Sequence, residues 1–252
     1  MTDILDFHAR LGPHPQAAAR MLATMDNCGI TRAVVVAGGM IDLERLSRHV
    51  VEGGHIEADA DNQAVLDACE GSDGRLVPFW FGNPHRTAGR YRDAAGFRGL
   101  ELSPAVHGVP LTDVRNTAFV EVAAEHRHPV YIVCLGRPGA GVADLVTLAG
   151  KFPEVTFVLG HCGFVGIDVN AVSRVVDTPN IVAETSGCYT GVAGAAVERL
   201  GAGRVLFGTE YPLQHPRVEL AKFDALGLGP ADWQRIAWDN GHRLLDPSEE
   251  RA

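Results

Sequence analysis

The 252-residue chain lacks the features that mark membrane-spanning, secreted and disulfide-bonded proteins. No apolar run approaches the ~20 residues that a membrane helix needs. No basic segment followed by an apolar one stands at the N-terminus. The five cysteines are odd in number, irregularly spaced and without a CxxC pair. We therefore expect a cytoplasmic protein with reduced thiols.

Positive charge is also scarce. Lys and Arg number 22 against 31 Asp and Glu, which gives a formal net charge of −9. Such an acidic chain is a poor match for nucleic acid or an anionic membrane, so neither is expected as a partner. Hydrophobic residues make up 46% and charged residues 21%, as in ordinary globular proteins. Because no low-complexity linker divides the chain, we expect one domain over residues 1–252.

Short apolar runs alternate with longer helical patterns along the chain. About eight such strand–helix units, at intervals of roughly 30 residues, favour a closed (β/α)8 barrel, the TIM-barrel fold. A doubly wound open sheet is the alternative, but no GxGxxG motif follows the first strand. The expected strands cover residues 4–8, 33–38, 76–81, 99–104, 130–136, 156–161, 181–187 and 205–210, and the expected helices 15–27, 59–70, 86–95, 114–126, 141–151, 168–177, 191–199, 216–226 and 230–245.

Polar and ionisable residues stand at the carboxyl ends of these strands, where such barrels carry their functional groups. Each has a structural explanation by itself; Glu101, for example, could be a core acid paired with Arg10 or Arg98. Barrel geometry would nevertheless aim them at one place. The sequence therefore predicts a site at the barrel mouth formed by His8, Arg10, Trp80, Glu101, Cys134, His161, Glu210 and Tyr211, with His55 and His107 contacting substrate from loops.

Several motifs in one order resemble the amidohydrolase-related (amidohydrolase-2) family, which includes aminocarboxymuconate semialdehyde decarboxylase-like enzymes and lactone-hydrolysing relatives. The resemblance covers most of the chain and implies a (β/α)8 barrel, in agreement with the strand count. It is carried by DFH (6–8), Asp61-Asn62, RLVPFWFGNP (75–84), RGLELSP (98–104), HPVYIVCLG (128–136), FPEVTFVLGHCG (152–163), IVAETSG (181–187), VLFGTEYP (205–212) and DNGHRLL (239–245).

The chain departs from this family at the metal ligands. Metal-binding members have an HxH motif on the first strand, a histidine after the fifth strand and an aspartate after the eighth. His8 matches the first histidine, but Arg10 stands at the second and Val133 at the third. Glu210 occupies the position of the aspartate. The resemblance thus implies a degenerate metal site.

The remaining donors are few. His161 matches a family histidine that acts in the reaction rather than as an obligatory ligand. His8 and Glu210 alone are too few for a tight zinc site, which needs three protein ligands. Cys134 lies one residue from the ligand position, which turns its side chain to the opposite face of a strand. We therefore expect no cofactor, apart from a zinc or manganese ion held weakly by His8 and Glu210.

The expected activity is a hydrolase that acts without a tightly bound metal on a small lactone, cyclic amide or related carboxylated substrate. Glu210 would be the general base, Arg10 would bind an oxyanion or carboxylate, and His8 and His161 would relay protons or orient the substrate. Two alternatives remain: a metal-dependent non-oxidative decarboxylase of the same family, and an inactive barrel that binds a small molecule or a protein. Dimers are common in the family, so a homodimer is compatible with the resemblance.

Overall fold

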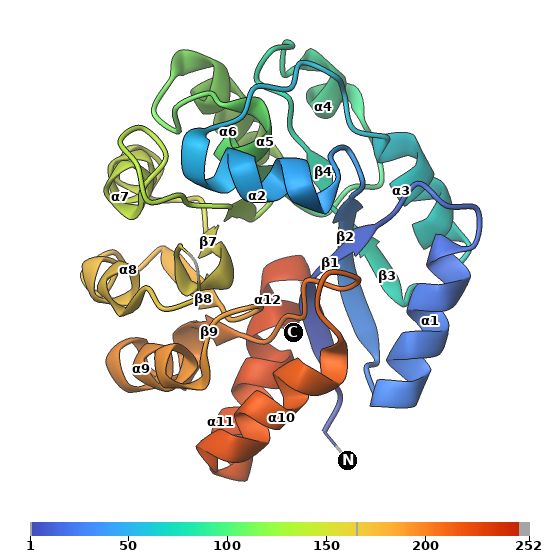
Figure 1. Cartoon of the computed structure of the whole chain (residues 1–252), viewed down its shortest axis with the longest axis vertical. Coiled ribbons are helices and arrows are strands. Elements are labelled where there is room, and N and C mark those ends of the chain that lie inside the picture. Colours follow the sequence, from blue (N-terminus) through green and yellow to red (C-terminus); the bar gives the residue numbers. More distant parts are fainter. Residues whose placement is uncertain (1, 165, 247–252) are drawn as a thin grey trace.

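The computed structural model describes residues 2–164 and 166–246. Parallel strands form a ring at its centre and helices surround them, as Figure 1 shows. The strand order is β1-β2-β3 in one sheet and β4-β5-β6-β7-β8-β9 in the other. The strands are β1 (Leu5–Leu11), β2 (Arg32–Ala37), β3 (Leu76–Pro78), β4 (Trp80–Phe81), β5 (Leu100–Leu102), β6 (Val130–Ile132), β7 (Phe157–Leu159), β8 (Ile181–Glu184) and β9 (Val205–Leu206).

The helices follow the strands around this ring (Figure 1). They are α1 (Ala17–Cys28), α2 (Leu43–Glu52), α3 (Asn62–Glu70), α4 (Gly89–Asp93), α5 (Pro104–His107), α6 (Val114–His126), α7 (Val142–Lys151), α8 (Val169–Arg174), α9 (Thr190–Leu200), α10 (Pro216–Leu226), α11 (Pro230–Gln234) and α12 (Asn240–Leu245), with 3-10 turns η1 (Gly160–Cys162) and η2 (Ala202–Arg204) and a π-helical turn η3 (Arg235–Asp239).

Backbone hydrogen bonds close the ring. The chain after β9 returns to β1, where the Phe7 N–H donates to the Phe207 carbonyl at 2.9 Å and the Glu210 N–H donates to the His8 carbonyl at 2.8 Å. Between β3 and β4, the Phe79 N–H donates to the Val35 carbonyl of β2 at 2.9 Å, so these two short strands are one stretch that changes partner. The predicted (β/α)8 barrel is confirmed.

Neighbouring residues on each strand pack in different layers. On β6, Tyr131 belongs to the cluster that fills the barrel with Phe7 and Phe79, whereas Val130 and Ile132 pack outward. Both layers are apolar because side chains alternate across a strand and each face of this sheet is covered. A residue between two outward leucines, such as Glu101, must therefore point into the barrel.

Helix α2 and the short helix α5 were not expected. Asp42 caps α2, and its side chain accepts a hydrogen bond from the Arg45 N–H at 2.7 Å. No residue of α2 is buried, so the helix lies over the end of the barrel instead of packing in its outer wall. Leu46 and Val50, one helical turn apart, face the cavity described below.

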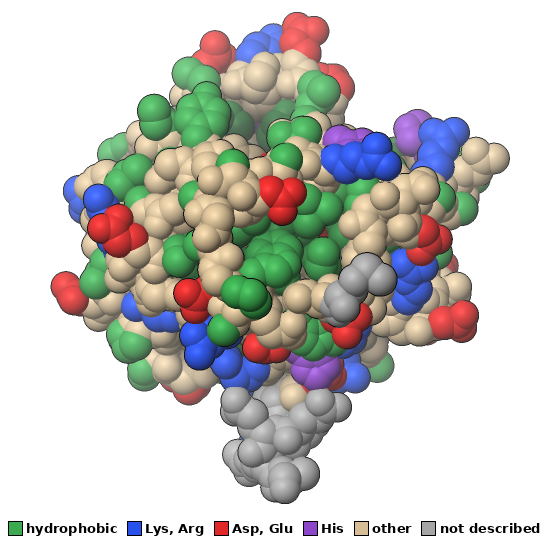
Figure 2. Space-filling view, turned by 90° about the horizontal axis from the view of Figure 1, so that it is seen from below, with side chains coloured by type: hydrophobic (Ala, Val, Ile, Leu, Met, Phe, Trp, Pro, Cys, Tyr) green, Lys and Arg blue, Asp and Glu red, His purple; other side chains and the backbone are tan. Residues whose placement is uncertain are grey.

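The surface is mixed in charge. Figure 2 shows one face, on which acidic and basic side chains are interspersed around a central group of hydrophobic ones. Across residues 2–164 and 166–246, no helix has both the length and the apolar character that a membrane crossing requires.

Histidine 128, two residues before β6, gives a pH-dependent stability prediction. The Tyr91 hydroxyl lies 2.8 Å from its Nδ1, and burial together with the His126 and Arg98 charges lowers the pKa of His128 from 6.5 to about 4. Because the unfolded chain binds this proton more readily, the contribution to stability is full above pH 6.5 and falls as the pH drops toward 4. His128→Asn should reduce the loss of unfolding free energy between about pH 7 and about pH 5, measured by urea denaturation. An identical loss in both proteins would contradict this origin.

Candidate active site

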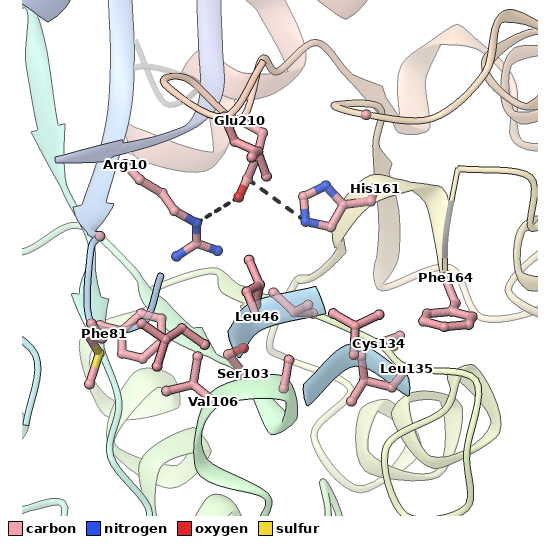
Figure 3. Close-up of a pocket in the computed structure, with 18 of the residues that line it drawn as sticks. Arg10, Leu46, Phe81, Ser103, Val106, Cys134, Leu135, His161, Phe164 and Glu210 are labelled. Atoms are coloured by element: carbon pink, nitrogen blue, oxygen red, sulfur yellow. Dashed lines mark hydrogen bonds and ion pairs between the residues drawn. The ribbon is translucent and has the colours of Figure 1, made fainter. Parts of the chain in front are cut away.

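A cavity of about 380 Å³ opens at the carboxyl ends of the strands. Figure 3 shows Arg10, Glu210 and His161 on one side of it, with apolar side chains opposite. The polar residues come from β1, from the loop after β9 and from η1. The facing wall includes Leu46, Phe81, Val106, Leu135 and Phe164. The cavity thus has one charged wall and one apolar wall.

Arg10 connects two carboxylates. Its Nε donates to Oε1 of Glu210 at 2.7 Å, and its Nη2 donates to Oε1 of Glu101 at 2.8 Å. Glu101 is fully buried and also lies 3.0 Å, through Oε2, from Nε2 of His8. Nδ1 of His8 in turn contacts Oε2 of Glu210. Four ionisable groups from β1, β5 and the loop after β9 therefore form one closed ring of contacts.

These contacts set the protonation states. Burial alone would raise the pKa of Glu210, but the Arg10 and His8 charges outweigh it and hold that pKa well below its usual range. The same two residues lower the pKa of Glu101 against the effect of burial. For His8, burial alone would lower the pKa, but Glu210 and Glu101 raise it to about 10. Both acids are therefore ionised when the protein holds no metal.

Three of the donors could hold a metal ion. His8, His161 and Glu210 each offer a ligand atom, and these atoms all lie within 4.8 Å of one another. Nε2 of His161 is 3.9 Å from Oε2 of Glu210. Nδ1 of His8 and Oε2 of Glu210 contact each other, so two of the three ligand atoms already face one another. Two imidazoles and a carboxylate are a common set of three protein ligands.

The outer contacts of the two histidines also suit this role. A ligating histidine usually donates its second ring N–H to a carboxylate or a carbonyl oxygen. His8 has Glu101 at its Nε2, and His161 has the Ser186 carbonyl and Oγ at 3.1 and 3.0 Å from its Nδ1. The other ring nitrogens, Nδ1 of His8 and Nε2 of His161, are the ones that face Oε2 of Glu210. The residues present therefore fit a divalent metal ion.

Backbone strain is concentrated at the same residues. His161, Cys162 and Glu210 adopt positive φ angles of 58°, 53° and 56°. Such left-handed conformations are uncommon for residues other than glycine and cluster at functional sites. The strained backbone thus occurs at His161 and Glu210, two residues whose side chains line the cavity.

A buried pair not predicted from the sequence supports both histidines. The Tyr131 ring stacks on the His8 ring with centroids 4.0 Å apart and planes within 7°. Its hydroxyl donates to Oε2 of Glu184 at 2.6 Å, and the same oxygen accepts the His161 N–H at 3.2 Å and the Ser186 hydroxyl at 2.9 Å. One acid on β8 thus positions both histidines.

Two glycines make room for this pair. A Cβ on Gly160 would lie 2.6 Å from the Tyr131 ring, and one on Gly208 would lie 2.1 Å from Oε1 of Glu184. The glycines in LGHCG and FGTE were the sequence signals that could have pointed to Tyr131 and Glu184.

Cys134 lines the cavity, and the predicted difference in facing between it and Val133 is seen: Val133 packs against the cluster that fills the barrel, whereas Cys134 belongs to the outer cluster. β6 ends at Ile132, so Val133 and Cys134 follow in irregular backbone and both line the cavity. Among the described residues, Cys134 is not in the group of donors that could hold a metal ion. Burial raises the pKa of the Cys134 thiol, which keeps it protonated.

Four of the predicted residues belong neither to the cavity lining nor to the ring of ion pairs beside it. Trp80 packs on Tyr91 and Phe97 in the outer layer. The Tyr211 hydroxyl lies 3.5 Å from the Thr24 hydroxyl of α1. The two loop histidines are absent from the lining: His107 is buried with Nδ1 2.7 Å from the Ile56 carbonyl, and His55 is exposed beside Glu57.

Solved structures of similar fold cover almost the whole chain at low sequence identity. 5-Carboxyvanillate decarboxylase from Novosphingobium aromaticivorans DSM 12444, complexed with manganese and 4-hydroxy-3-methoxy-5-nitrobenzoic acid, is 15% identical, with 97% of this chain and 96% of that chain aligned at a TM-score of 0.71. 2,6-Dihydroxybenzoate decarboxylase from Rhizobium is 15% identical over 98% and 99% of the two chains, with a TM-score of 0.70.

A third structure is a dihydroxybenzoic acid decarboxylase from Polaromonas sp. JS666 with bound manganese and 2-nitroresorcinol. It is 16% identical over 98% of this chain and 97% of its own, with a TM-score of 0.69. At these identities the likeness demonstrates the shared barrel. No curated protein matches the sequence.

The prediction of a hydrolase that acts without a tightly bound metal is wrong in both its parts, the reaction and the metal. The similar structures are decarboxylases, which are lyases, and two of those described above contain manganese. The chain itself brings His161 beside His8 and Glu210, which gives three donors where the sequence suggested two. The expectation of no cofactor failed because His161 is distant in sequence from both partners.

Sequence comparison agrees with the fold. The family model described as Amidohydrolase matches residues 5–246, which includes every strand and helix named above. The protein therefore belongs to the amidohydrolase family.

Proposed function

We propose that this protein is a metal-dependent non-oxidative decarboxylase of a small hydroxylated aromatic carboxylic acid. The observation that carries the proposal is the cluster of His8, His161 and Glu210 at a mainly apolar cavity, which His161, Glu210 and Arg10 line and beside which His8 is buried. His8 Nδ1, His161 Nε2 and a Glu210 oxygen would hold the ion. Bound there, a divalent ion such as manganese acts as a Lewis acid on substrate oxygen atoms.

The cavity matches a substrate with one ring and one charged edge. Its volume of about 380 Å³ falls within the range of small-molecule sites. Phe81 and Phe164 offer apolar surface to a ring, and Arg10 is turned toward the same space (Figure 3). A guanidinium is suited to binding a carboxylate. The named relatives act on hydroxylated benzoates, which have this form.

Decarboxylation also needs a proton at the ring carbon. The bond between the ring and the carboxylate breaks, CO₂ leaves, the electron pair stays on the ring carbon and a proton replaces the lost group. Glu210 can accept that proton from a hydroxyl or acid group of the substrate and return it to the carbon. Its lowered pKa means that it is ionised before the reaction. The apolar wall keeps bulk water from the reacting carbon.

The direct test measures CO₂ release from 2,6-dihydroxybenzoate, 5-carboxyvanillate and related hydroxybenzoates, with the protein stripped of metal and then reloaded with Mn²⁺. We expect release only from the reloaded protein, with one ring product per CO₂. Hydrolysis of lactones or cyclic amides without CO₂ release from any acid would overturn the proposal, as would full activity after complete chelation.

Glu101→Gln tests the outer support of this site. The substitution keeps the shape of the side chain but removes the charge that orients His8 and pairs with Arg10. We expect manganese affinity to fall by about 10–100-fold, as is typical when a partner of a ligating histidine is lost. Titration calorimetry of metal-free protein measures this change. Unchanged affinity would show that Glu101 does not support metal binding. Glu198→Gln, at an exposed position on α9, is the control.

The proposal also covers the partner and the cellular compartment of the protein. A small-molecule acid is its partner in the reaction, and the cytoplasm is its compartment. The structure has five free cysteines, four of them buried, which is the cysteine usage of a reducing compartment.

A further inference from the structure

A second group of metal-type donors lies outside the cavity. His55 and Glu57 belong to the segment between α2 and α3, and His85 follows β4. Each offers one ligand atom, and these atoms all lie within 4.8 Å of one another. Nε2 of His55 is 3.0 Å from Oε1 of Glu57, and the His55 and His85 rings have centroids 4.5 Å apart. None of the three lines the cavity of the proposed active site.

The backbone holds His55 and Glu57 on the same side. Between them, Ile56 is buried, its N–H donates to the Val106 carbonyl at 2.9 Å, and its carbonyl lies 2.7 Å from Nδ1 of His107. With Ile56 directed inward, the residues on either side of it are directed outward. Their side chains are 61% and 65% exposed, so an ion could enter from solvent without rearrangement.

His85 is held by hydrogen bonds that link it to the Glu57 segment. Its N–H donates to Oδ1 of Asn83 at 3.0 Å, and the amide of Asn83 donates to the Glu57 carbonyl at 3.0 Å. The ring nitrogen Nε2 of His85 lies 2.9 Å from the His107 carbonyl, a contact that requires its proton there and leaves the lone pair on Nδ1. A ligating histidine is commonly oriented in this way.

Three arginines, Arg86, Arg90 and Arg115, line a hollow together with Glu57 and His85. Each is paired with an acid, which offsets its charge. Nε of Arg86 lies 3.4 Å from both carboxylate oxygens of Asp59, Nη1 of Arg90 lies 3.6 Å from Oδ2 of the same residue, and Nε of Arg115 donates to Oδ1 of Asp113 at 2.9 Å. Glu57 keeps its charge because its hydrogen bond with His55 lowers its pKa. Two imidazoles and one carboxylate favour zinc and similar transition metals over calcium or magnesium, which prefer oxygen ligands.

We propose that His55, Glu57 and His85 form a second site that binds a divalent transition-metal ion, with zinc as the ion that suits its ligands best. Such an ion would tie the segment that follows α2 to the loop after β4. Helix α2 has no buried residue, yet Leu46 and Val50 line the active-site cavity. An ion at this site would therefore hold in place the segment that covers the cavity.

The test counts zinc on the full-length protein. Metal-free protein is titrated with Zn²⁺ by calorimetry, and bound zinc is measured after gel filtration for the wild type, His55→Asn, Glu57→Gln and the double variant His161→Ala/Glu210→Gln. His14→Asn is the matched control, because His14 is also an exposed loop histidine. We expect two bound ions in the wild type and in His14→Asn, and one in each of the other variants.

The outcomes distinguish the second site from the proposed active-site metal. If the cavity bound no ion, the wild type would hold one zinc, and His55→Asn would still remove it. Equal zinc content in the wild type, His55→Asn and Glu57→Gln would overturn the inference. Hydrogen exchange gives a second readout: zinc should slow exchange over residues 53–58 in the His161→Ala/Glu210→Gln variant and leave it unchanged in His55→Asn. Exchange that slows equally in both would also overturn it.

Discussion

Replacing Arg10 with methionine should lower the free energy of unfolding by about 3–5 kcal/mol, the usual cost of removing one member of a buried ion pair. Arg10 pairs with Glu101, which is fully buried, and with Glu210, which is 8% exposed; His8 is the second cation that contacts both acids. Methionine fills similar space but leaves the two ionised acids with His8 as their counter-charge. For a chain of this length we expect the melting temperature to fall by roughly 10 °C.

Urea denaturation of metal-free protein at neutral pH measures the effect, since a bound ion would itself stabilise the acids. Arg10→Lys should recover only part of the loss, because a single ammonium cannot donate to both carboxylates in the geometry of a guanidinium. Arg235→Met is the control: its ion pair with Asp232 is about half exposed and should contribute at most about 1 kcal/mol. Equal stability of Arg10→Met and Arg235→Met would show that Arg10 is not the cation that makes the buried acids tolerable.

Replacing Glu210 with glutamine should abolish tight manganese binding and lower kcat/KM for CO₂ release by roughly 10²–10³-fold or more. Glu210 provides one of the three ligand atoms and contacts Arg10 at the cavity wall. Glutamine keeps the shape and an oxygen for Arg10 but removes the charge that attracts the ion and accepts the proton. Elemental analysis and steady-state rates at several Mn²⁺ concentrations separate the two losses.

High Mn²⁺ concentrations should restore occupancy but not the wild-type rate, because glutamine cannot accept a proton. Glu198→Gln, on the exposed face of α9, should behave as the wild type. If Glu210→Gln kept both its metal and its rate, Glu210 would be neither ligand nor proton acceptor, and the assignment of the cavity would have to change.

His161 shows where the sequence was insufficient. Its place in LGHCG marked it as functional, but nothing local indicated that its Nε2 lies beside Glu210. That proximity depends on the closure of the ring from β7 through β9 to β1 and on the left-handed backbone at both residues. A ligand count made along the chain therefore found two donors where the fold assembles three.

Tyr131 and Glu184 are site residues that the sequence did not identify at all. Both lie in apolar strands, and their sequence context is typical of core residues. A strand pattern does not indicate which hydrogen-bond partners a buried polar group has. Only the stacking on His8 and the contacts to the His161 and Ser186 backbones identify them as supports of the site.

The sequence by itself determined the alternation of strands and helices, the barrel and the family, because these follow from hydrophobic periodicity and from motifs that are local in the chain. It also placed Arg10 and Glu210 at strand ends. The tertiary structure alone decided that Arg10 spans Glu101 and Glu210, that His161 completes a three-donor cluster and that Trp80 and Tyr211 face away. Those facts depend on distances between strands far apart in sequence, which hydrophobic pattern does not encode.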